Sequence, residues 1–116
     1  MPRIDAVGIK TFDATPGRRL VLEIEDNGID ILHRCGGFAR CTTCRVEIVD
    51  GDPGEMNERE RRRLAREEAL DPNIRLACQI LCENDLSLRV INRLSETDLS
   101  DAGPRVLEDI DAPRPD

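Results

Sequence analysis

The spacing of four cysteines constrains this chain more than any other feature. Cys35, Cys41 and Cys44 lie in one short glycine-rich segment, with five residues between the first two and two residues between the second two. Cys78 follows after a further 33 residues. A binuclear iron–sulfur centre needs four thiolates, two on each iron, and a loop that supplies three of them must have little side-chain bulk. The pattern therefore predicts one 2Fe–2S cluster bound by these four cysteines.

The residues between the cysteines suit such a loop. Gly36 and Gly37 can adopt the positive φ angles that a tight wrap requires, and Thr42 and Thr43 can donate hydroxyl hydrogen bonds near the cluster. The alternative is a zinc site with four thiolates. Structural zinc sites usually combine two closely spaced cysteine couples, whereas here three cysteines stand together and one stands alone. The arrangement favours iron and sulfide over zinc.

On these residues the chain resembles the 2Fe–2S ferredoxins of the β-grasp fold, in their adrenodoxin-like and related bacterial branch. The five-residue spacing and the segment Arg-Leu-Ala-Cys-Gln at 75–79 carry the resemblance, which extends from residue 3 to residue 93. It implies an α+β fold: a mixed sheet, one main helix packed across it and the cluster loop at one end. It also implies that Cys35 and Cys41 hold the outer iron, nearer solvent, and that Cys44 and Cys78 hold the inner iron.

The residue pattern gives a coarse order of elements. Alternation and turn residues predict a first hairpin, a central strand and a closing hairpin, over residues 3–7 with 11–14, 45–49, and 79–82 with 86–91. Residues 18–27 fit either a strand or a short helix by pattern, and the resemblance favours the helix. A second helix is predicted over 58–70, with Asn57 as its N-cap.

Two domains of very different character are expected. Residues 1–93 form the ferredoxin domain, and residues 94–116 form an acidic, proline-containing extension that is mobile or lies along the surface. Cys82 is interpreted as a small buried hydrophobe rather than a substitute ligand. His33 is interpreted as an exposed loop residue without a role.

The charge of the chain indicates the kind of partner it meets. A net charge of −7 is unsuited to nucleic-acid phosphates or anionic membranes and suits brief, salt-sensitive contact with other proteins. The helix at 58–70 departs from the family, whose acidic residues in this region dock the reductase. Here the glutamates are balanced by five arginines: Arg59, Arg61, Arg62, Arg63 and Arg66. The sequence predicts a solvated helix with weak ion pairs, and acidic docking residues elsewhere.

The sequence carries no nucleophile–base set, phosphate loop or dinucleotide fingerprint. We therefore expect a soluble one-electron carrier rather than an enzyme. The resemblance implies a ferredoxin reductase as donor, a redox protein as acceptor, and a monomer. The alternative is a redox-sensing module, which the acidic extension would serve. An odd number of cysteines and an N-terminus without an apolar signal predict a reducing cytoplasm.

Overall fold

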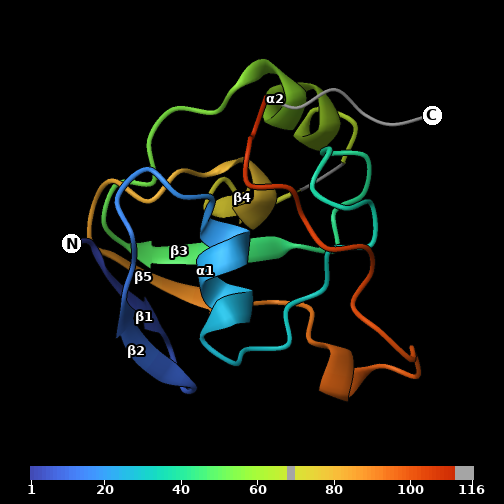
Figure 1. Cartoon of the computed structure of the whole chain (residues 1–116). Coiled ribbons are helices and arrows are strands. Elements are labelled where there is room, and N and C mark those ends of the chain that lie inside the picture. The colour runs from blue at the N-terminus through green and yellow to red at the C-terminus, as the bar shows by residue number, and fades with distance from the viewer. Residues whose placement is uncertain (68–69, 112–116) are drawn as a thin grey trace.

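A computed structural model describes residues 1–67 and 70–111. Its centre is a mixed sheet in which strands far apart in the sequence lie side by side (Figure 1). The strand order is β2-β1-β5-β3-β4. Their bounds are β1 Arg3–Ala6, β2 Lys10–Asp13, β3 Arg45–Asp50, β4 Ile74–Leu76 and β5 Leu86–Val90. Only β1 and β5 run parallel among these pairs, and the others are antiparallel. The predicted α+β architecture and first hairpin are confirmed.

Helix α1, Leu20–Asp26, packs across this sheet, as Figure 1 shows. Five successive residues from Leu20 to Ile24 are buried, so the alternation that suggested a strand comes from a helix covered on most sides. The helix ends at Asn27, and Gly28 follows with φ +85°, a conformation that glycine adopts without strain. The preference for a helix over residues 18–27 is confirmed.

The predicted closing hairpin is wrong. Residues 77–79 form a short 3-10 helix, η1, and β5 pairs with β1 and β3 instead of with the preceding segment. The physical reason is that Leu86 and Leu88 face the core from a central strand, whereas the segment before it bends toward α1. The short strand β4 was not predicted. It pairs with β3 through Leu76, which is opposite Arg45.

Helix α2 covers Glu58–Leu64, so the predicted helix over 58–70 is too long. Asn57 caps it as predicted, with its side chain accepting from the Glu60 backbone N–H at 2.9 Å. Beyond Leu64 the amides of Arg66 and Glu67 bond to carbonyls three residues back, which tightens the last turn and ends the helix. Residues 68–69 lie outside the described residues.

A buried ion pair joins α2 to β4. Glu60 is fully buried and its carboxylate accepts from Arg75 Nε at 2.7 Å and Nη2 at 2.8 Å, and from the Leu76 backbone N–H at 2.8 Å. The sequence analysis predicted that this helix is solvated, and for Glu60 that prediction is wrong. Because its oxygens are used by three donors, the pair fixes the strand that leads directly to Cys78.

Residues 94–111 run back along the domain and contact α1 and the cysteine loop (Figure 1). Val106 is buried in the same core cluster as the strands. Arg105 bonds to Glu25 and Asp26 on α1, and hydrogen bonds from Arg105 and Arg18 lower the pKa of Asp26 to about 2. Among the described residues, no helix has the length and apolar character needed to cross a membrane.

Candidate metal centre

The segment between helix α1 and strand β3 is a loop in which several residues have positive φ angles. Gly36 and Gly37 have φ of +76° and +91°, as their sequence predicted, and Ala39 has φ +56°. A Cβ at Gly37 would approach Val106 Cγ1 to 2.6 Å and Arg19 Nη2 to 2.8 Å. No side chain larger than hydrogen fits at Gly37 without displacing these groups. The loop is therefore pressed closely against the rest of the molecule at this point.

The structure brings the four predicted cysteines together as two pairs. The Cys41 thiol donates to Cys35, and this hydrogen bond lowers the pKa of Cys35 to about 4 and raises that of Cys41. A hydrogen bond between Cys44 and Cys78 raises the pKa of Cys44 and lowers that of Cys78. Over residues 1–67 and 70–111, no three Cys, His, Asp or Glu side chains gather as a site for one ion. Two couples of thiols are the donor set that a two-iron cluster takes.

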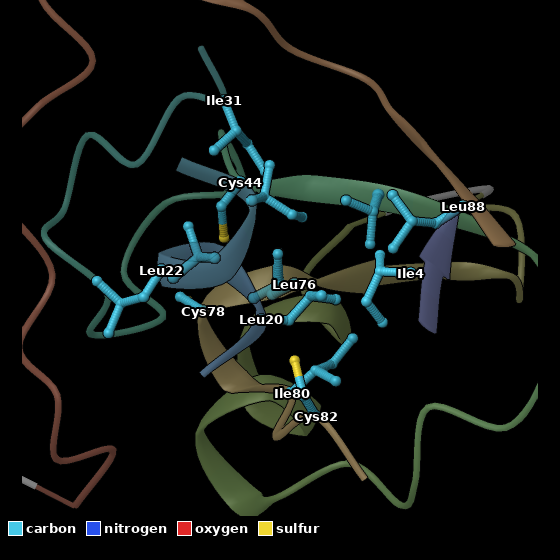
Figure 2. Close-up of a cluster of buried hydrophobic side chains, with 14 of the residues drawn as sticks. Ile4, Leu20, Leu22, Ile31, Cys44, Leu76, Cys78, Ile80, Cys82 and Leu88 are labelled. Atoms are coloured by element: carbon cyan, nitrogen blue, oxygen red, sulfur yellow. The ribbon is translucent and has the colours of Figure 1, made fainter. Parts of the chain in front are cut away.

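The two pairs differ in their exposure. Cys35 and Cys41 are half-buried in the loop, whereas Cys44 and Cys78 are buried, with 1% and 0% of their surface exposed. Figure 2 shows Cys44 and Cys78 among the buried aliphatic side chains. One pair therefore lies close to solvent and the other lies in the core.

Arg19 connects the parts of the site. Its guanidinium is buried and donates to the Cys78 carbonyl at 2.6 and 3.0 Å, to the Gly37 carbonyl at 2.5 Å and to the Leu107 carbonyl at 2.8 Å. Burial lowers the pKa of Arg19, while the nearby cysteine sulfurs act in the opposite direction. The sequence analysis missed this residue, because an arginine before an aliphatic helix looks like an exposed capping residue.

The polar side chains of Thr43 and Gln79 lie against cysteine sulfurs, and His33 lies nearby in the sequence. Thr43 Oγ1 lies 3.1 Å from the Cys41 sulfur, close to the cysteines as predicted. Gln79 Nε2 donates to the Gly37 carbonyl at 2.9 Å and lies 3.4 Å from the Cys78 sulfur. His33, expected to be exposed, is buried and bonds through Nε2 to the Glu25 carboxylate. That expectation was wrong because the C-terminal segment covers the residue, and the His33 amide donates to the Ala102 carbonyl there.

Cys82 stands outside this group. It is fully buried beside Ile80, and Figure 2 shows it apart from Cys44 and Cys78. Burial raises the pKa of its thiol to about 12, with a further contribution from Glu23. The predicted burial of Cys82 is confirmed, and its position apart from the two pairs distinguishes it from the other four cysteines.

A glycine-bearing loop and two thiol pairs at one end of a mixed sheet define a protein that binds a binuclear iron–sulfur cluster. The chain belongs to the family of 2Fe-2S iron-sulfur cluster binding domains, whose pattern it matches over residues 5–83. It carries one 2Fe–2S cluster, as members of this family do. It is 36% identical over 92 residues to a 2Fe-2S ferredoxin of Pseudomonas aeruginosa, a match that covers 73% of this chain and 82% of the relative.

Solved structures show the same β-grasp fold. The ISC-like [2Fe-2S] ferredoxin FdxB of Pseudomonas putida superposes with a TM-score of 0.69 at 26% identity, covering 78% of this chain and 93% of that one. Reduced putidaredoxin from Pseudomonas putida gives a TM-score of 0.65 at 32% identity, with 78% and 97% covered. Putidaredoxin has also been solved in a covalent complex with putidaredoxin reductase. The resemblance on which the fold was predicted is confirmed.

Proposed function

We propose that Cys35, Cys41, Cys44 and Cys78 are the four ligands of the cluster. Their grouping into one pair near solvent and one pair in the core is the observation that supports this most directly. Cys35 and Cys41 would hold the outer iron, and Cys44 and Cys78 the inner one. Cys82 would hold none, since its thiol is buried apart from the others.

The bound cluster supplies one-electron oxidation and reduction. The residues around it determine how easily it accepts that electron, because reduction adds negative charge to a partly buried centre. The buried Arg19 cation offsets that charge from the α1 side. Thr43 and Gln79 reach the sulfurs of Cys41 and Cys78 with polar groups, and such contacts favour the reduced state. Val106 and the C-terminal segment exclude water from the Gly37 side of the loop.

The chain then works as a one-electron carrier between a reductase and a redox acceptor protein. Cys35 and Cys41 are half-buried and Arg40 beside them is exposed, which gives the electron a short route to the surface. The covalent complex of putidaredoxin with its reductase supports a reductase as one partner. A monomer in a reducing cytoplasm suits a chain in which none of the five cysteines forms a disulfide.

Two measurements test the cofactor and its ligands. The anaerobically purified protein should contain about two iron and two acid-labile sulfide ions per chain and give an EPR signal only after one-electron reduction. Serine at Cys35, Cys41, Cys44 or Cys78 should reduce cluster content, and serine at Cys82 should not. Full cluster content in any one of the four variants would remove that residue from the ligand set.

A separate assay tests the carrier role. With a ferredoxin reductase and NAD(P)H, the protein should support many turnovers of reduction of a haem protein such as cytochrome c. Reduction of the cluster without onward transfer, combined with a change of oligomeric state on reduction, would instead indicate a redox sensor.

A further inference from the structure

A groove lined by arginines lies directly beside the cysteine loop. It has a volume of about 320 Å³ and is bounded by the loop on one side and by α2 and the turn after it on the other. Its lining residues are Phe38, Ala39, Arg40, Arg59, Arg62, Arg63 and Arg66. The first three lie between Cys35 and Cys41 in the sequence, so the floor of this arginine groove is part of the cluster loop itself.

The positive charge of the groove is only partly compensated. Arg62 pairs with Glu58 at 2.5 Å, but both side chains are more than two-thirds exposed, so the pair is weak. Arg63 pairs with Glu67 at 3.0 Å and donates to the Arg40 carbonyl. Leaving Arg59 aside, the four guanidinium groups of Arg40, Arg62, Arg63 and Arg66 face two carboxylates among the described residues, on a chain whose net charge is −7.

Two of the arginines are open to an incoming group. Arg40 and Arg66 are exposed, and neither forms an ion pair within the described part of the chain. Arg59 donates to the Ile110 carbonyl, so the C-terminal segment contacts one end of the groove. Like charges three and four positions apart on a helix repel each other by a few tenths of a kcal/mol. Arg59, Arg62 and Arg63 have this spacing on α2, and Arg66 follows in the turn after it, so an anionic partner bound in the groove would relieve this repulsion.

We propose that the arginine groove is the surface on which a redox partner docks, and that the partner presents a cluster of carboxylates there. The inference rests on the proposed function. It follows from charge complementarity and from the position of the groove on the loop between Cys35 and Cys41, where the electron would leave. It also reverses the polarity expected from the family resemblance, in which the ferredoxin supplies the acidic side.

The sign of the local charge can be measured with small redox ions. The dithionite-reduced holoprotein, freed of excess dithionite by gel filtration, is mixed in a stopped-flow instrument with [Fe(EDTA)]⁻. One electron passes from the cluster to Fe(III), giving [Fe(EDTA)]²⁻ and the oxidised cluster, and no proton is transferred. The rate is followed by the visible absorbance of the cluster. The same measurement with the cation [Co(NH₃)₆]³⁺ is the opposite-charge comparison.

For the wild-type protein the rate with [Fe(EDTA)]⁻ should fall as salt is added, although the whole chain is negative. The double variant Arg62→Glu/Arg66→Glu should slow this reaction by about eightfold at 10 mM ionic strength and by twofold or less at 0.5 M, for charges about 10 Å from the oxidant. The matched control is Arg3→Glu/Arg89→Glu, which changes the net charge equally on the sheet and should leave the rate within about twofold. If the glutamate variant loses its cluster, Arg62→Gln/Arg66→Gln should show about half the effect in free energy.

The choice of a protein partner is tested with two polyanions. Poly-L-glutamate should inhibit the [Fe(EDTA)]⁻ reaction of the wild type and the control, and not that of the groove variant. A rate with [Fe(EDTA)]⁻ that rises with salt, or equal effects of groove and control variants, would overturn the proposal. Stronger inhibition by a single-stranded oligonucleotide of equal charge would overturn the assignment to an acidic protein. A colourless wild-type protein would instead refute the proposed function, before any of these rates are measured.

Discussion

Replacing Arg19 by methionine tests whether one buried cation organises the cluster site. The side chain donates to the buried carbonyls of Cys78 and Gly37, and hydrogen bonds from a charged donor contribute about 1.5–3 kcal/mol each. Gly37 keeps a second donor, Gln79, and methionine avoids the cost of burying a guanidinium, so part of the loss is offset. We expect the holoprotein to lose about 2–3 kcal/mol, as a net of these terms.

The assay follows the loss of the cluster in moderate guanidinium under argon, by the decay of visible absorbance. A rate is the proper measure because a protein that loses its cofactor on unfolding does not refold reversibly. Arg19→Met should lose its cluster about 30- to 160-fold faster than the wild type when the whole loss appears in the unfolding rate, since 1.36 kcal/mol corresponds to tenfold. The matched control is Arg89→Met, because Arg89 is 57% exposed and forms a surface pair with Glu47.

A second readout separates charge from structure. Removing the positive charge of Arg19 should make the reduction potential more negative, by about 90 mV for a charge acting over roughly 8 Å at an effective dielectric constant near 20. Arg19→Lys should retain most of the potential while losing stability, because an ammonium group cannot donate to three carbonyls as a guanidinium does. If Arg19→Met keeps both the wild-type potential and the Arg89→Met rate of cluster loss, the organising role of Arg19 is refuted.

Four further outcomes are expected. Cys78→Ala should lose or badly weaken the cluster, whereas Cys82→Ala should keep the visible spectrum, and the reverse result would reassign the fourth ligand. Glu60→Gln should speed cluster loss in urea by at least about 100-fold, as a loss of about 3–5 kcal/mol implies, because it leaves a buried guanidinium uncompensated. Val106→Ala should cost about 1–2 kcal/mol and speed cluster loss, while Leu107→Ala, at an exposed position, should change neither rate nor stability appreciably. Removing iron with a chelator should make residues 35–44 the first site of protease cleavage, detected by mass spectrometry. Without bonds to iron, the loop is held only by weaker contacts of its thiols and is cleaved more easily.

The cysteine loop could be predicted from the sequence because it depends on local rules, and the fold class followed from the family resemblance that the cysteine spacing carries. Ligand spacing and glycine positions are properties of a short segment, and they were sufficient to identify the loop. The strand partner of Leu86–Val90 could not be predicted in the same way. Two neighbouring apolar runs look like a hairpin, and only the tertiary structure shows that β5 is inserted between β1 and β3.

The buried polar residues were missed for a different reason. Glu60 lies four residues before the buried Leu64, so both occupy the same helix face, and this periodicity was a signal that Glu60 faces inward. His33 and Arg19 offered no such signal. Their burial depends on the C-terminal segment, whose carbonyls at Ala102 and Leu107 accept hydrogen bonds near them.

The same buried groups explain how a cysteine from a distant part of the chain meets the loop. On the N-terminal side of Cys78, Glu60 anchors both the Arg75 side chain and the Leu76 backbone. On the other side, Gln79 donates to the Gly37 carbonyl, and Arg19 links that carbonyl to the carbonyl of Cys78 itself. Each contact joins β4 or η1 to an element formed earlier in the chain. These contacts hold β4 and η1 against the cluster loop from two sides, and they place Cys78 opposite that loop although 33 residues separate it from Cys44.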